Sequence, residues 1–223
     1  MSEDLNKLRD AIDVIDGEIL QALARRMKLS DRVIAAKGGV AAFRPGREAQ
    51  LVRQLVGTGG QLGLSAPVIL GIWRQIMAAS LGRQNGQQAC AVHPDALPAA
   101  VWHMGPMLDA RSDDSLTALV GMVAQGDCRY ALVPAGGALT GLAAALAAHP
   151  GVYVMARTPF YDIPSIPPSF ILADYLPDPS EDDISLFLQT TDDGGLDLKA
   201  VDGYHSAPDD AGDTPRLVGV YAR

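Results

Sequence analysis

The chain has 223 residues, 48% hydrophobic and 20% charged, which is enough to bury a core and to divide into two domains. No uncharged apolar run reaches 18 residues, so no membrane span is expected, and the acidic, polar start is unlike a signal peptide. Two cysteines, Cys90 and Cys128, are too few for a disulfide framework. We therefore expect a cytoplasmic protein with no membrane partner.

The net charge of −8 is unevenly distributed along the chain. Residues 1–88 carry 12 Lys or Arg against 8 Asp or Glu, whereas residues 89–223 carry 6 against 18. An anionic ligand is therefore expected in the basic first part. Aromatic residues are few and the acidic second part would repel phosphate, so nucleic acid is not an expected partner.

The first predicted element is a long helix over residues 5–37. Its apolar residues recur at steps of three and four, and Gly38-Gly39 end it; the seam is Leu5, Leu8, Ile12, Ile15, Ile19 and Ala22. At ~1.5 Å per residue the helix is about 50 Å long. The two shorter helices that follow are too short to cover it, so pairing with a second copy of the chain is expected.

Two further helices are predicted in the basic part. Arg44-Pro45-Gly46 opens one over residues 45–56, which the glycines at 57, 59 and 60 end. Ser65 is a suitable N-cap, with Pro67 in the first turn, for another that reaches about Arg83. Residues 1–88 are thus predicted to form an all-α domain of three helices.

Short apolar runs separated by helical segments follow in residues 89–223, which predicts a small α/β domain. Helices are expected over residues 115–124 and 139–148, and acidic turns or loops over 192–195 and 209–213. Strands are expected over residues 101–102, 130–133, 152–155, 170–172, 184–188 and 217–221.

Three cations stand out on the first helix. Arg26 and Lys37 are eleven residues apart, so they project within about 20° of each other, ~16 Å apart along the axis. Both can reach one small anion. Arg9 lies ~25 Å from Arg26, so it could join that site only from an antiparallel partner chain. Spacing alone favours a plainer interpretation, in which the three are solvated cations on a helix.

Taken together, motifs in the first 88 residues resemble the all-helical chorismate mutases, whose protomers intertwine through a long first helix. The motifs are Leu8-Arg9 with Ile12, Ile15 and Asp16; Ala24-Arg25-Arg26; Lys37; Arg44-Pro45-Gly46-Arg47-Glu48; and Ser80 with Gln84. The resemblance implies a homodimer that converts chorismate to prephenate in a pocket shared between two protomers.

The resemblance also assigns roles. Arg26, Arg47 and Ser80 would bind the substrate, with Arg9 entering from the other chain. Lys37 and Gln84 would donate to the breaking ether oxygen, and Glu48 would accept from the ring hydroxyl. The rearrangement of this dicarboxylate is pericyclic, so it needs a held conformer and stabilised charge rather than a nucleophile, a metal or a cofactor.

Plainer explanations remain for two of these residues. Glu48 could form a surface ion pair with Arg44 or Arg47, and Ser80 could be a buried hydroxyl bonded to its own helix. Two rival functions also remain open. An isochorismate pyruvate-lyase uses a similar scaffold and cationic site, and a non-catalytic protein could sense aromatic amino acids through its second half.

The second half resembles a truncated prephenate dehydratase. The resemblance lies in residues 126–134 with Gly141, in residues 169–172 and in residues 182–186. Gly136-Gly137-Ala138 replaces the dehydratase Glu-Asn-Ser, and Pro168-Ser169-Phe170 replaces Thr-Arg-Phe. This half is therefore expected to be catalytically dead as a dehydratase. The histidines at 93, 103, 149 and 205 lack metal-ligand spacing.

Overall fold

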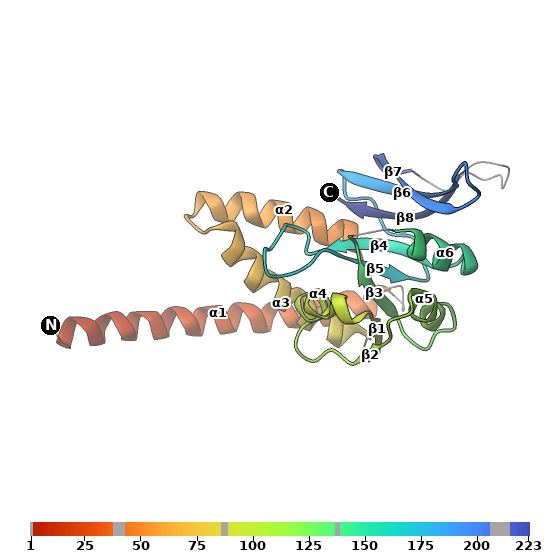
Figure 1. Ribbon diagram of the computed structural model, residues 1–223. Coiled ribbons are helices and arrows are strands. Elements are labelled where there is room, and N and C mark those ends of the chain that lie inside the picture. Colours follow the sequence, from red (N-terminus) through yellow and green to blue (C-terminus); the bar gives the residue numbers. More distant parts are fainter. Residues whose placement is uncertain (1, 38–42, 86–88, 137–138, 206–214) are drawn as a thin grey trace.

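The computed structural model describes residues 2–37, 43–85, 89–136, 139–205 and 215–223. The first three elements are the helices α1 (Ser2–Lys37), α2 (Pro45–Gln61) and α3 (Ala66–Asn85), which confirms the three predicted helices. A sheet with further helices follows them (Figure 1). The described residues contain no helix long and apolar enough to cross a bilayer.

The second helix is longer than predicted. The glycines after Val56 predict that the helix ends there, but α2 continues through them to Gln61. Gly59 is buried here, and an added Cβ would lie 2.3 Å from Cδ1 of Ile69 on α3. The glycine therefore permits close packing of α2 on α3, and the chain turns only at Gly63, where φ is +80°.

The N-terminal half of α1 extends away from the rest of the molecule (Figure 1). Its apolar seam is open to solvent: Leu8 is 63% exposed, Ile12 56% and Ile15 55%. Toward its C-terminal end the helix meets α3, where Arg83 pairs with Asp31 at 2.6 Å. None of the residues that the structure describes therefore covers the first half of the seam predicted from the sequence.

The second part of the chain forms one mixed eight-stranded sheet with the order β2-β1-β3-β5-β4-β8-β6-β7. Strands β2, β1 and β3 are parallel, β4 and β8 are parallel, and the other neighbours are antiparallel. The strands are β1 (Cys90–Val92), β2 (Ala110–Ser112), β3 (Tyr130–Pro134), β4 (Tyr153–Thr158), β5 (Ser169–Ala173), β6 (Asp183–Thr190), β7 (Leu196–Asp202) and β8 (Arg216–Ala222). The helices are η1 (Pro94–Ala96), α4 (Leu97–Met104), α5 (Leu116–Ala124) and α6 (Thr140–Ala148).

Five of the six predicted strands are confirmed as β3, β4, β5, β6 and β8, and both predicted helices as α5 and α6. The strand expected at Val101-Trp102 is wrong, because these residues lie inside α4. A two-residue apolar run does not distinguish a strand from a buried helix. The acidic turn at 192–195 joins β6 to β7, whereas residues 209–213 lie outside the described part of the chain.

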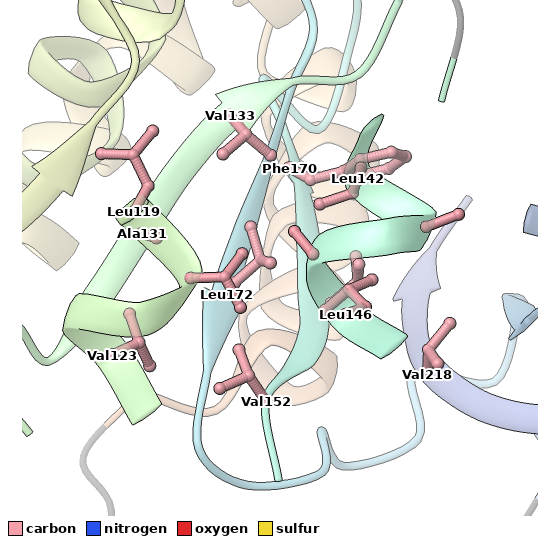
Figure 2. Packing of buried hydrophobic residues seen from close by; sticks show 14 of the residues in the cluster. Leu119, Val123, Ala131, Val133, Leu142, Leu146, Val152, Phe170, Leu172 and Val218 are labelled. Atoms are coloured by element: carbon pink, nitrogen blue, oxygen red, sulfur yellow. The ribbon is translucent and has the colours of Figure 1, made fainter. Parts of the chain in front are cut away.

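Each face of the sheet carries its own hydrophobic cluster. On one face, α5 and α6 pack through Leu119, Leu142 and Leu146 against the strands (Figure 2). On the other, a second cluster includes Ala100 of α4 and Leu81 of α3. Successive β3 residues alternate between the clusters, as expected of a strand covered on both sides. The three-helix region therefore packs on the second face of the sheet.

Candidate active site

Four of the seven predicted site residues line one pocket between α1, α2 and α3. Arg26 comes from α1, Arg47 and Glu48 from α2, and Ser80 from α3. The pocket has a volume of about 130 Å³, and the rest of its wall is Ser30, Leu51, Met77 and Leu81. Residues up to 54 positions apart in the sequence thus meet in one site.

A direct hydrogen bond joins Arg26 to Ser80. Nη1 of Arg26 donates to Oγ of Ser80 at 2.8 Å, and that hydroxyl donates to the carbonyl of Ile76 at 2.9 Å. Ser80 therefore bonds its own helix and also orients the arginine. Burial lowers the pKa of Arg26, and the negative charge of Glu48 opposes that shift. The guanidinium keeps its positive charge near pH 7, because arginine is not deprotonated in proteins.

Glu48 is paired with a residue that the sequence analysis did not single out. Nη1 of Arg74 donates to Oε2 of Glu48 at 2.7 Å, and the arginine side chain is only 9% exposed. This pair takes the place of the alternative predicted from the sequence, an ion pair of Glu48 with Arg44 or Arg47. In the sequence, Arg74 stands out only as a cation among the apolar residues of α3. Its partner Glu48 lies 26 residues away, so the sequence does not indicate the pair.

The sheet domain fixes the start of α2. The carboxylate of Asp178 accepts from the backbone N–H groups of Gly46 at 3.2 Å and Arg47 at 3.1 Å, and it pairs with Arg44 at 3.2 Å. It thus caps N–H groups that a helix leaves without partners in its first turn. A Cβ at Gly46 would lie 2.3 Å from the carbonyl oxygen of Asp178. The turn that presents Arg47 and Glu48 is therefore held from outside the helical region.

The described lining of this pocket does not include the other three predicted site residues. The side chains of Lys37 and Gln84 lie outside what the structure describes, although both residues are helical. Arg9 is exposed on the protruding half of α1. It is absent from the pocket lining. The predicted roles of Lys37, Gln84 and Arg9 therefore stay predictions.

The arrangement suits recognition of a small anion rather than nucleophilic chemistry. Arg26 and Arg47 supply guanidinium donors for carboxylates, and Ser80 and Glu48 supply uncharged and acidic hydrogen-bonding groups. The described residues hold no group of three or more His, Cys, Asp or Glu that could bind a metal ion. Such a pocket can hold a dianion in one conformation.

The described positions that stand at the two dehydratase motifs in the second half are Gly136 and residues 168–170. Ser169 is fully buried at the start of β5, and its hydroxyl donates to the carbonyl of Pro167 at 3.3 Å. Phe170 belongs to the hydrophobic cluster under α5 and α6 (Figure 2). Gly136 is exposed after β3, and residues 137 and 138 lie outside the described part of the chain.

A solved structure titled "GqqA- a novel type of quorum quenching acylases" aligns with 62% of this chain and 96% of its own length. The sequences are 16% identical over that alignment and the TM-score is 0.40, which is too slight a likeness to support an inference about fold or function.

The helical part of the chain matches a family model. Residues 8–85 match chorismate mutase type II, a range that contains Arg9, Arg26, Lys37, the start of α2, and Ser80 with Gln84. The match covers the N-terminal part and stops where the sheet domain begins. Residues 8–85 are thus similar to chorismate mutase type II, and the enzyme activity that this match supports is that of an isomerase.

Proposed function

We propose that the protein converts chorismate to prephenate in the pocket formed by Arg26, Arg47, Glu48 and Ser80. The observation that carries this proposal is that three helices of a chorismate mutase type II region bring these four side chains together. Arg26 and Arg47 bind the carboxylates, and Ser80 holds Arg26 in place through the 2.8 Å hydrogen bond. Glu48, fixed by Arg74, accepts from the ring hydroxyl.

Lys37 and Gln84 complete the site as donors to the ether oxygen. They follow from the family pattern and from helical position: Lys37 is eleven residues after Arg26, and Gln84 is one turn after Ser80. Donors fixed before the reaction stabilise the charge that develops as the C–O bond breaks. A bound diaxial conformer supplies the remaining acceleration, because it places the reacting carbons together.

The active unit is a homodimer in which each pocket receives Arg9 from the partner chain. The exposed Leu8, Ile12 and Ile15 support this proposal, because an apolar stripe of that length is seldom left in water. Arg9 lies about 25 Å from Arg26 along α1, farther than one chorismate reaches. An antiparallel partner helix would cover the stripe and bring its Arg9 to the pocket.

The sheet domain has no dehydratase activity in this proposal and acts as a support for α2. Its cap on Gly46 and Arg47 is the contact that gives it this role. We place the domain boundary at residue 88, and a chain with only two cysteines, both buried, suits a reducing, cytoplasmic setting. Purified protein given prephenate at neutral pH should form phenylpyruvate no faster than buffer does; faster formation contradicts the proposal.

An assay of chorismate consumption with identification of the product tests the proposed activity. Prephenate is the expected product, and isochorismate, assayed in parallel, should not release pyruvate at a comparable kcat/KM. Pyruvate release from isochorismate with little prephenate from chorismate would favour the lyase. Turnover of neither substrate would favour a non-catalytic sensor.

A further inference from the structure

A second cavity shares Glu48 in its wall with the proposed active site. It is enclosed by α2, α3, α4, β4 and the segment after β4, and Glu48 and Met77 line both cavities. Its volume is about 60 Å³, several times what one water needs. The proposed active site and this cavity are therefore neighbours that share two side chains.

Arg74, which lines this cavity, has two nitrogen donors without a partner among the described residues. The residue is 8% exposed and lines the cavity, and its Nη1 donates a hydrogen bond to Glu48. Its Nε and Nη2 are buried and have no hydrogen-bond partner among the described residues. These two groups form the side of a guanidinium that binds both oxygens of a carboxylate in one plane. A buried charged donor without a partner is costly, which indicates a missing acceptor.

His103, which also lines the cavity, adds a third polar atom without a partner among the described residues. Its Nδ1 lies 3.1 Å from Oγ1 of Thr158, while its buried Nε2 has no partner among the described residues. Burial and the positive charge of Arg74 lower the pKa of His103 well below 6.5, so the ring is neutral near pH 7. If the Thr158 hydroxyl donates to Nδ1, Nε2 carries a proton and can donate to an anion.

The remainder of the lining is mostly apolar. A second cation, Arg157, reaches the cavity while also paired with Asp162 at 2.8 Å. The apolar wall includes Val52, Leu70, Trp102, Phe160 and Ile163. A ligand here would meet one fork of donors at one end and hydrophobic side chains around its body. That combination fits an organic acid better than inorganic phosphate, whose oxygens would face apolar groups on several sides.

We propose that this cavity is a binding site for a small carboxylic acid with an apolar body, held in a bidentate manner by Nε and Nη2 of Arg74. His103 Nε2 donates a third hydrogen bond to the carboxylate. The apolar side chains around Trp102 and Phe160 contact the body of the acid. The site is distinct from the proposed active site, which contains neither Arg74 nor His103.

The bound acid also acts on the active site, a consequence that rests on the proposed mutase function. Arg74 would then share its charge between Glu48 and the acid, and a further negative charge would lie behind the pocket that receives the chorismate dianion. Each ligand should therefore weaken the binding of the other by the same factor. The acid is expected to raise KM for chorismate more than it lowers kcat.

The test uses the full-length protein with Trp73→Phe, which leaves Trp102 as the sole tryptophan. Benzoate and propionate are the probes, and benzamide and propionamide are their uncharged counterparts. At least one acid should change Trp102 fluorescence to saturation, and its amide should bind at least about tenfold more weakly. Failure of both acids to bind, or equal binding of acid and amide, overturns the proposal.

Two further variants locate the binding in this background. Arg74→Lys keeps a cation for Glu48 but removes the planar fork, and should weaken acid binding about tenfold. Arg26→Ala, in the other pocket, should leave it unchanged; loss of binding there places the acid in the active site and overturns the proposal. Because fluorescence does not depend on turnover, acid binding to a protein without mutase activity would contradict the proposed function and leave this site standing.

Discussion

The two regions of the molecule differ in how completely they bury their apolar residues. The sheet has a hydrophobic cluster on each face, and residues such as Leu132 and Leu146 are fully buried within one chain. In the helical region, the first half of α1 leaves its seam exposed. The sheet domain therefore has its apolar residues covered within one chain, partly by the helical region, whereas the exposed seam of α1 is the reason for proposing a partner chain.

The two regions also contribute unequally to the proposed reaction. All seven predicted site residues belong to the helices, yet Asp178 of the sheet domain caps the turn that presents Arg47 and Glu48. Arg53 strengthens the same junction, since it donates to the carbonyls of Ser180, Asp182 and Arg223. In the proposed function, the sheet domain therefore positions residues of the helical region through these contacts.

The largest effect is expected from removing the donors to the ether oxygen. Lys37→Ala or Gln84→Ala should lower kcat for chorismate at least about 10²-fold, the scale of losing one preorganised donor. Steady-state kinetics with prephenate detection measures the change. Lys28→Ala, on an exposed position of the same helix, is the matched control and should keep near-normal turnover.

Folding of these variants should be unaffected, because both side chains are proposed to face a pocket. Circular dichroism and thermal melting check this point. Near-normal kcat in Lys37→Ala and Gln84→Ala would remove the proposed chemistry from the helical region.

A smaller effect is expected at the junction. Arg53→Ala removes three hydrogen bonds to carbonyls and a contact with the ring of Phe160, whose centroid is 5.2 Å from the guanidinium carbon. The free energy of unfolding should fall by about 2 kcal/mol. Urea denaturation measures it, with the exposed Gln54→Ala on the same helix as control. Equal stability of the two variants would show that the junction contributes little.

The smallest effect is expected on the pH dependence of the free energy of unfolding, through His103. Its pKa is lowered well below 6.5 in the folded protein, chiefly by burial and then by Arg74, so the unfolded chain takes up a proton that the folded chain does not. The free energy of unfolding should therefore fall as the pH falls below 6.5, by about 1 kcal/mol per pH unit.

Urea denaturation at pH 7.5 and pH 5.5 compares the wild type with His103→Phe. The variant should lose less stability on acidification, by about 1 kcal/mol, because it lacks the buried histidine. The same pH dependence in both proteins would mean that His103 is protonated in the folded state.

Much of the fold follows from periodicity, and the misses have physical causes. Strand β2 is short and exposed, and only its parallel register with β1 makes it a strand. Strand β7 alternates Leu196, Leu198 and Ala200 with polar residues, a period-two signal that the adjacent acidic turn obscured. The end of α2 was misplaced because Gly59 serves tight packing rather than a helix stop.

The candidate site was predictable in part, because family spacing places Arg26, Arg47, Glu48 and Ser80 on three helices that converge. The Arg74 pair was not, since no local rule connects residues 26 positions apart on different helices. The cap from Asp178 was equally hidden, because it joins positions 132 residues apart across two regions. Contacts of this kind depend on how the regions dock, which composition and periodicity do not encode.

The most direct test of the central claim is complementation between two inactive homodimers. Arg9→Ala and Arg26→Ala should each abolish turnover, since each removes a guanidinium from both pockets of the dimer. After mixing and re-annealing, a heterodimer would carry both lesions in one pocket and leave the other intact, so activity should return toward half that of the wild type per heterodimer. Mixtures that stay inactive, although heterodimers are shown to form, would contradict a pocket shared between chains.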